Sequence, residues 1–320
     1  MVYLILTKDL KTAFVRDLDL PMKAFDSPVF EDRLAILDCY TPCLNAYQDY
    51  LMLLDRFQTE DEYFAFRNEI RNKAIEHLNN RPEVQNFKDF VNNLPSNQQR
   101  GYPKRAVYKE PYIGKYFVSF DIRKGNFTAL HHFNPDILDG CHTYDEWISQ
   151  FTDIPFIQKS KHFRQSIFGK SDIGDPLIQK YEAYLMNMVI DDISILTPDL
   201  IRCKNADEVV YELTEEQAKN LIPQFQAIVE YNQKRNINIR CEVFQLKRVL
   251  HMGYVKDVLY GEQPFVFKDL PSHYLPFMLR TMKNEKYQRS DYYRMQGNEM
   301  IENLDVPDFE LPDFLKGRFE

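Results

Sequence analysis

Two strand-like runs, each beside an acidic side chain, constrain the fold of this chain more than any other feature. The first, residues 116–121, reads Tyr-Phe-Val-Ser-Phe-Asp and ends on Asp121. The second begins with Asp207 and Glu208 and continues Val-Val-Tyr-Glu-Leu. β-Branched and aromatic residues favour strands, and the polar residues before Asp207 are typical of a hairpin tip. We therefore expect an α+β fold in which an antiparallel sheet brings the two acidic runs together.

A basic and aromatic element lies between these runs, at residues 159–169. Arg164 and Phe168 are four residues apart, so they share one face of a helix. A cation beside an exposed aromatic ring could bind a triphosphate and stack on a base. The alternative is an amphipathic helix with Ile167 and Phe168 in the core, and the spacing alone favours it. Likewise, a single Asp at a strand end is most often a turn residue.

The overall charge limits how this chain could bind nucleic acid. Its net charge is −8 and its sequence pI is about 5.5, whereas a non-specific nucleic-acid coat is usually basic. Any such contact must be confined to a local groove. The five cysteines form no CxxC pair, so we expect reduced thiols rather than zinc. With neither a signal peptide nor an apolar run long enough for a membrane span, the sequence predicts a cytoplasmic protein that contacts no membrane.

Helix signals and a linker divide the remaining sequence. Capping-box spacings at Thr59, Thr143 and Thr214 predict helix starts, and residues 28–94 read as a helical region broken near Pro42. The polar stretch 96–105 reads as a linker. Its basic residues could grip a single-stranded phosphate backbone, or they could simply be a solvated loop. The basic residues proposed for nucleic-acid binding are Arg100, Lys104 and Arg105.

Three segments in order resemble motifs A, B and C of the family A nucleic-acid polymerases, the group of bacterial DNA polymerase I and the T7-type enzymes. In motif A, Asp121 matches the catalytic Asp, and Asn126 stands where the DNA polymerases have Glu. In motif B, Arg164, Phe168 and Gly169 match a basic residue, an aromatic residue and a glycine. In motif C, the sequence from Asp207 to Glu212 matches all but the preceding His, which is Ala206 here. The resemblance covers roughly residues 116–246; a further resemblance, to proteins of tailed phages and large DNA viruses, is carried by no motif.

Several departures from the family pattern weaken the polymerase resemblance more than the palm resemblance. The early basic position of motif B falls on Ser160, and the family's Tyr after the Phe is Asp172. The separation between Asp121 and Asp207 is also far smaller than in full-length members of the family. The missing residues would come mostly from the fingers.

The resemblance implies a palm-like sheet backed by helices and a division of the chain. Residues 1–95 would form an opening strand and a thumb-like helical subdomain, 96–110 a linker, 111–250 a palm with reduced fingers, and 251–320 an extension. Asp121 and Asp207 would bind Mg²⁺ or Mn²⁺ with Glu208 assisting, which suits two-metal phosphoryl transfer. The residues implied in nucleotide binding are Lys161, Arg164, Phe168 and Asn126.

Two other functions fit the same residues. The expected partners of a reduced nucleotidyltransferase are a nucleoside triphosphate and a single strand or primer–template end. The acidic pI and altered motif B favour instead a palm-like scaffold that has lost catalysis and binds nucleic acid or a protein. In a third case, a structural assembly protein, the acidic pair would only stabilise turns.

Overall fold

The fold is α+β, with one six-stranded antiparallel sheet in the order β2-β3-β1-β4-β5-β6. The computed structural model describes residues 5–95, 102–103, 107–250, 253–302, 311–316 and 318. The strands of this sheet are β1 (Tyr116–Ile122), β2 (Ile201–Lys204), β3 (Glu208–Leu213), β4 (Ile239–Leu250), β5 (Gly253–Tyr260) and β6 (Phe265–Lys268). A separate hairpin pairs β7 (Tyr293–Gln296) with β8 (Glu299–Glu302).

Helices make up most of the rest of the described chain. Those before the sheet are α1 (Lys8–Asp17), α2 (Val29–Leu37), α3 (Leu44–Leu54), α4 (Glu60–Asn79) and α5 (Glu83–Asn93). Those between β1 and β2 are α6 (Gly125–Phe133), α7 (Tyr144–Ile148), α8 (Pro155–Lys159), α9 (Lys161–Lys170) and α10 (Gly174–Asp192). The later ones are α11 (Glu215–Asn220), α12 (Ile222–Lys234) and α13 (Leu275–Met282).

The predicted helix starts are confirmed at all three threonines. Thr59 accepts a hydrogen bond from the backbone of Glu62, and Thr143 accepts one from Glu146. At Thr214 both bonds of the capping box are present, with Gln217 as partner. These bonds satisfy backbone N–H groups that the first turn of a helix leaves without partners.

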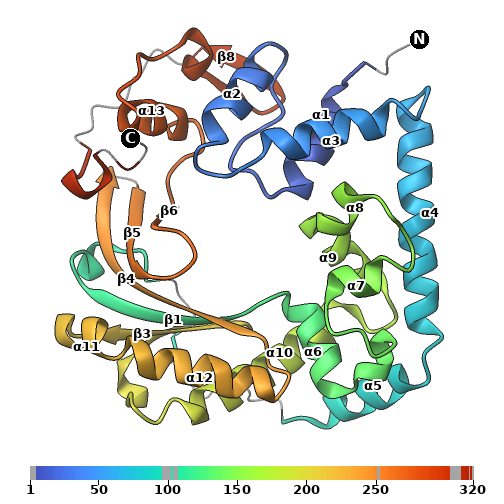
Figure 1. Ribbon diagram of the computed structural model, residues 1–320, viewed down its shortest axis with the longest axis vertical. Coiled ribbons are helices and arrows are strands. Elements are labelled where there is room, and N and C mark those ends of the chain that lie inside the picture. The colour runs from blue at the N-terminus through green and yellow to red at the C-terminus, as the bar shows by residue number, and fades with distance from the viewer. Residues whose placement is uncertain are drawn as a thin grey trace.

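The order of elements in the first four strands is that of a split β-α-β-β-α-β unit. β1 lies between β3 and β4, with Asp121 directly opposite Glu208 on one side and Arg240 on the other. α10 connects to the β2–β3 hairpin, and α11 and α12 connect β3 to β4. In Figure 1 these three helices lie on the same face of the sheet. The expected antiparallel pairing of the acidic runs is therefore present.

The two faces of β1 have different roles because side chains alternate along a strand. Phe120 points to the helix-covered face, where its ring contacts Phe225 of α12 edge-on at 5.8 Å between centroids. Phe117 and Asp121 belong to the opposite face, where Phe117 stacks on Phe244. The sheet thus holds Asp121 on the face away from its covering helices.

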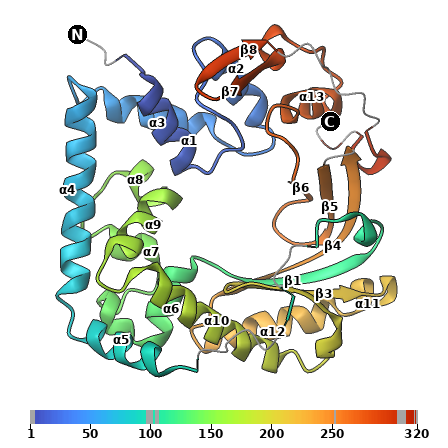
Figure 2. The same cartoon turned by 180° about the vertical axis from the view of Figure 1, so that it is seen from behind.

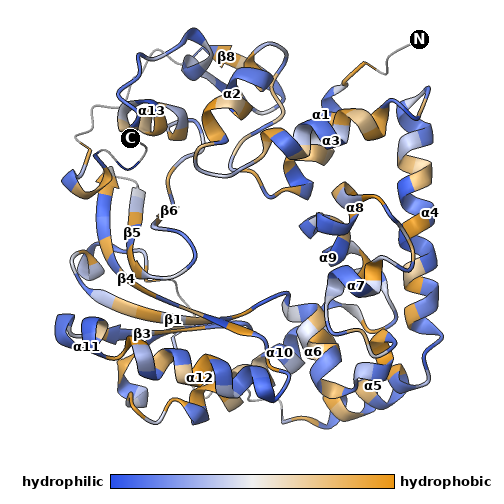
Figure 3. Cartoon of the chain, viewed as in Figure 1, coloured by the Kyte–Doolittle hydropathy of each residue, from blue (hydrophilic) through white to orange (hydrophobic). Residues whose placement is uncertain are grey.

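The elements follow one another around a ring that closes where α2 meets α13 and the β7–β8 hairpin, as Figures 1 and 2 show. Arg33 of α2 donates hydrogen bonds to the backbone carbonyls of Ser290, Asp291 and Tyr293. Figure 3 shows apolar and polar residues mixed along α4 and α12, as expected of helices with one buried face. No helix in the described ranges is long and apolar enough to cross a membrane.

Several sequence expectations need correction. The predicted strand at residues 2–6 is not seen at Ile5 and Leu6, and residues 1–4 lie outside the described residues. The helix predicted from Thr214 to Tyr231 is two helices, because the chain leaves helical geometry at Leu221 before Pro223. The break near Pro42 is confirmed, since α2 ends at Leu37 and α3 begins at Leu44.

Candidate functional site

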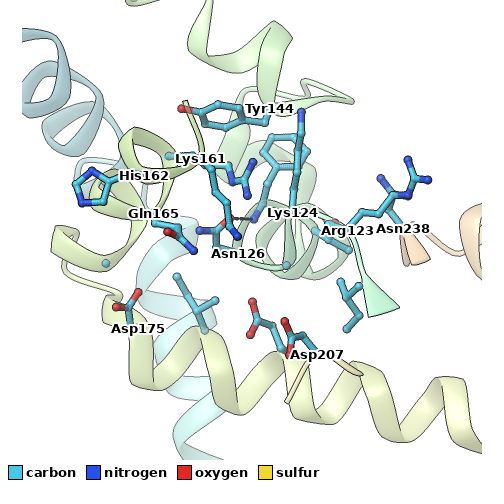
Figure 4. A pocket seen from close by; sticks show the side chains of 18 of the residues that line it. Arg123, Lys124, Asn126, Tyr144, Lys161, His162, Gln165, Asp175, Asp207 and Asn238 are labelled. Carbon is cyan, nitrogen blue, oxygen red and sulfur yellow. Dashed lines mark hydrogen bonds between the residues drawn. The ribbon is translucent and has the colours of Figure 1, made fainter. Parts of the chain in front are cut away.

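A pocket of about 1280 Å³ lies at the end of β1, between the sheet and the helices α1, α4, α6, α7, α9 and α10. Figure 4 shows Asp175 and Asp207 on one side of it and Tyr144, Lys161, His162 and Gln165 on the other. The pocket therefore separates two groups of opposite charge. We call them the acidic floor and the basic wall.

Four carboxylates make up the acidic floor. Asp121 comes from the end of β1 and Asp207 from the tip of the β2–β3 hairpin. The hairpin tip is fixed to β1 because the Ile122 N–H donates to the Asp207 carbonyl at 2.8 Å. Asp175 and Glu182 are seven residues apart on α10 and so lie on one side of that helix. All four line the pocket.

Two glycines give the α10 carboxylates room to approach. A Cβ added to Gly125 would lie 2.4 Å from Glu182 Oε1, and one added to Gly169 would lie 2.8 Å from Asp175 Oδ1. Any larger residue would have to push the carboxylate away. The glycines at these two positions therefore shape the floor.

The proximity of these acids is visible in their ionisation. Burial, followed by the charges of Asp207, Asp175 and Asp121, raises the pKa of Glu182 to about 7. Burial and Asp207 also raise the pKa of Asp121, while Arg240 lowers it. Like charges held together favour the neutral form of one member, so the floor is electrostatically strained when all its acids are ionised.

Arg240 partly compensates this strain from the neighbouring strand. Its Nε lies 2.7 Å from Asp121 Oδ2, and its Nη1 lies 3.8 Å from Glu262 Oε2. Glu262, in the β5–β6 turn, also forms an ion pair with Arg123. A chain of alternating charges thus runs along the pocket edge from Asp121 to Arg123.

The basic wall comes from three helices, α1, α4 and α9. Its members, all of which line the pocket, are Arg16 of α1, Arg71 of α4, and Lys161, Arg164 and Lys170 of α9. Lys161 forms an ion pair with Asp19 at 2.6 Å, but the other four have no ion pair to any described carboxylate. In a chain of net charge −8, this is a locally basic surface.

Three polar groups around the basic wall are hydrogen-bond donors without a partner among the described residues. They are Nε of Arg71, Nε of Arg164 and the hydroxyl of Tyr144. The Arg164 guanidinium lies over the Tyr144 ring, 5.7 Å from its centroid, and Lys124 Nζ lies 5.6 Å from the same centroid. Buried donors are normally satisfied, so their presence in one pocket indicates a site built for an anion.

The sequence-predicted residues are distributed unevenly around this pocket. Asp121, Asp207, Asn126, Lys161 and Arg164 all line it, and the Asn126 Oδ1 accepts a hydrogen bond from the Phe127 N–H.

Two predicted residues lie elsewhere. Glu208 does not line the pocket, and its strongest charge partner is Lys256 on β5. Phe168 is fully buried, stacked on Trp147 at 5.6 Å, so the core alternative holds for it. The nucleic-acid candidates Arg100, Lys104 and Arg105 lie outside the described residues.

Comparison with protein-family models, with curated proteins and with solved structures found no match. What this site does must therefore be inferred from its own geometry.

The sequence did not predict half of the carboxylates of the acidic floor or most of the cations of the basic wall. Glu182 and Asp175 carry a signal, their spacing of seven on a predicted helix, but nothing in the sequence pairs that helix with Asp121. Arg16 and Arg71 carry no local signal at all. They reach the pocket only because α1 and α4 pack against α9.

Proposed function

We propose that this chain is a metal-dependent nucleotidyltransferase that acts on nucleic acid and uses a nucleoside triphosphate. One observation carries the proposal: a single pocket sets the four carboxylates of the acidic floor against the five cations of the basic wall, four of which form no ion pair with a described carboxylate. Phosphoryl transfer needs both kinds of charge, because carboxylates bind the divalent metal ion and cationic side chains bind the phosphates. The split β-α-β-β-α-β sheet, with Asp121 and Asp207 at adjacent strand ends, supports its comparison with a polymerase palm.

The residues present suit a divalent cation that is completed by substrate. Among the described residues, no group of three or more His, Cys, Asp or Glu side chains is arranged to hold a metal ion. Mg²⁺ is commonly bound through one or two carboxylates together with substrate phosphates and water. Asp121 and Asp207 provide such a pair, and burial together with the charge of Asp207 raises the pKa of Asp121, which a bound cation would offset. Mg²⁺ or Mn²⁺ bound there would activate the attacking hydroxyl and stabilise the leaving pyrophosphate.

The chain's own groups then divide the remaining work. The triphosphate is held by Arg164, Arg71 and the Tyr144 hydroxyl, whose donors lack other partners among the described residues. Asn126 lies between floor and wall, at the start of α6, where the sugar would lie. Its neutral amide replaces the family's Glu, so it supplies a hydrogen bond without a charge.

One observation favours a second candidate, an inactive palm-like scaffold. The Asp121 carboxylate already holds a guanidinium, and a permanent ion pair there would leave no place for a metal. Such a protein would still bind nucleic acid or a partner through its basic wall.

Nucleotide transfer to a labelled single-stranded oligonucleotide in Mn²⁺ separates the two. Asp121→Asn and Asp207→Asn should each reduce transfer by on the order of 1000-fold or more, because carboxylates that share metal act as one unit. Asp257→Asn is the matched control: Asp257 is about as buried as Asp121 and also holds a cation, Lys247, but does not line the pocket. Equal transfer by wild type and both floor variants would refute the proposal, and oligonucleotide binding without transfer would establish the scaffold.

A further inference from the structure

Arg240 occupies the position from which a cation would reach Asp121. The sheet register sets the two residues opposite each other on β4 and β1, and the Arg240 Nε contacts Asp121 Oδ2 at 2.7 Å. The Arg240 side chain is 52% exposed against 22% for Asp121, so the guanidinium covers the carboxylate from the solvent side. A metal ion that binds this oxygen must first displace the guanidinium.

Displacement costs little because a second acceptor is already in contact. Glu262 lies 3.8 Å from Arg240 Nη1, and its side chain is as exposed as that of Arg240. Arg240 and Glu262 are both more than half exposed, so the guanidinium keeps its contact with water as it turns from one carboxylate to the other. The long arginine side chain can turn from Asp121 to Glu262 without any movement of β4.

The remaining charges around Arg240 oppose its permanent release. Without this cation, the Asp121 carboxylate would lie beside the charge of Asp207 with no other ion pair to a described residue. The guanidinium therefore takes the place of the metal's charge while the pocket is empty.

We propose that Arg240 is a built-in counter-ion that competes with divalent metal for Asp121 and moves to Glu262 when metal binds. Arg240 thus sets the metal affinity of the pocket without being a ligand. This inference rests on the proposed function, since it assumes that Asp121 and Asp207 bind the metal.

The test is direct titration of the full chain with Mn²⁺ alone, following free Mn²⁺ by electron paramagnetic resonance at low ionic strength. Arg240→Gln should lower the Kd for Mn²⁺ about fivefold, since an adjacent positive charge is removed from an exposed site. Glu262→Gln should raise it about twofold, because Arg240 then loses its alternative acceptor. Added KCl should shrink both differences, since salt screens exposed charges.

Arg248→Gln is the matched control, on the same strand with a carboxylate partner, Glu110, that does not line the pocket. It should leave the Kd unchanged. An unchanged or higher Kd in Arg240→Gln overturns the inference.

The variant Asp207→Asn shows whether a negative result with Arg240→Gln concerns Arg240 alone or the proposed function as well. If Asp207→Asn loses Mn²⁺ binding while Arg240→Gln behaves as wild type, only the role of Arg240 is wrong. If Asp207→Asn binds Mn²⁺ like wild type, the floor is not the metal site and both proposals fall.

Discussion

Two charged clusters in this protein are built in opposite ways. At the ring closure, Arg33, Arg280 and Asp291 are almost completely buried, and each has several partners. Asp291 accepts from Arg280 and from the Gln288 backbone, and Arg33 is satisfied by three carbonyls. This cluster joins α2 to the C-terminal elements.

In the pocket, by contrast, like charges lie close together and several hydrogen-bond donors have no partner among the described residues. Glu182 faces other carboxylates, while the Nε atoms of Arg71 and Arg164 have no acceptor among the described residues. Such an arrangement costs stability, and it persists where a ligand supplies the missing charges. The contrast indicates that the closure cluster serves the fold and the pocket serves a ligand.

The largest effect should follow from breaking the closure cluster. Asp291→Ala removes the buried countercharge beside Arg33 and Arg280 and leaves Arg280 its pair with Glu285, which should cost about 3–5 kcal/mol in the free energy of unfolding. Urea denaturation measures this. Asp313→Ala, which removes the exposed partner of Lys316, should change stability by less than about 0.5 kcal/mol. A loss below about 1 kcal/mol in Asp291→Ala would mean that this cluster does not hold the ring closed.

The sequence predicted local structure better than long-range structure, and the two clusters show why. The threonine caps at Thr59, Thr143 and Thr214 join residues three apart, so the sequence contains the whole interaction. The pairing of the acidic runs was also predictable, because alternation and a hairpin tip limit how short strands associate.

The closure cluster and the basic wall were not predictable in this way. Arg33 meets Asp291 across more than 250 positions, and Arg71 meets Arg164 only through helix packing. Phe168 shows the remaining difficulty: its spacing from Arg164 fits both a base-stacking role and a core role, and only its burial against Trp147 decides between them.

An intermediate effect should come from relieving charge in the acidic floor. The pKa of Glu182 is raised from its ordinary value of 4.5 to about 7, so between these values the folded state binds more protons than the unfolded state. Stability contributed by this group is present below pH 4.5 and falls as the pH rises to about 7. Glu182→Gln should therefore be more stable than wild type by about 1–3 kcal/mol at pH 8 in EDTA, with little difference at pH 4.5.

Glu212 of β3 provides a control whose pKa shift, and therefore whose effect on stability, has the opposite sign. Lys115 and Arg202 form hydrogen bonds to it and lower its pKa despite partial burial. Glu212→Gln should thus destabilise the protein at pH 8 and still at pH 4.5, because the lowered pKa keeps the folded carboxylate ionised until the pH falls below its ordinary value. Urea denaturation of both variants at the two pH values checks the pair. If Glu182→Gln loses stability at pH 8, the Glu182 carboxylate is paired within the fold, as Asp291 is with Arg280.

The smallest effect on stability should come from a single hydroxyl, and it gives the sharpest comparison of a satisfied with an unsatisfied group. Tyr50 and Tyr144 are both fully buried, but the Tyr50 hydroxyl donates to the Leu10 carbonyl at 3.0 Å and the Tyr144 hydroxyl has no partner among the described residues. Tyr50→Phe should cost about 1 kcal/mol in urea denaturation, since it removes a buried hydrogen bond to the Leu10 carbonyl. Tyr144→Phe should change stability by less than about 0.5 kcal/mol, yet weaken calorimetric binding of a nucleoside triphosphate several-fold.

Equal destabilisation by the two variants would show that the Tyr144 hydroxyl is bonded within the fold. Unchanged triphosphate affinity would place the phosphates away from Tyr144, because a buried hydroxyl with no partner among the described residues gains a hydrogen bond from any phosphate that reaches it.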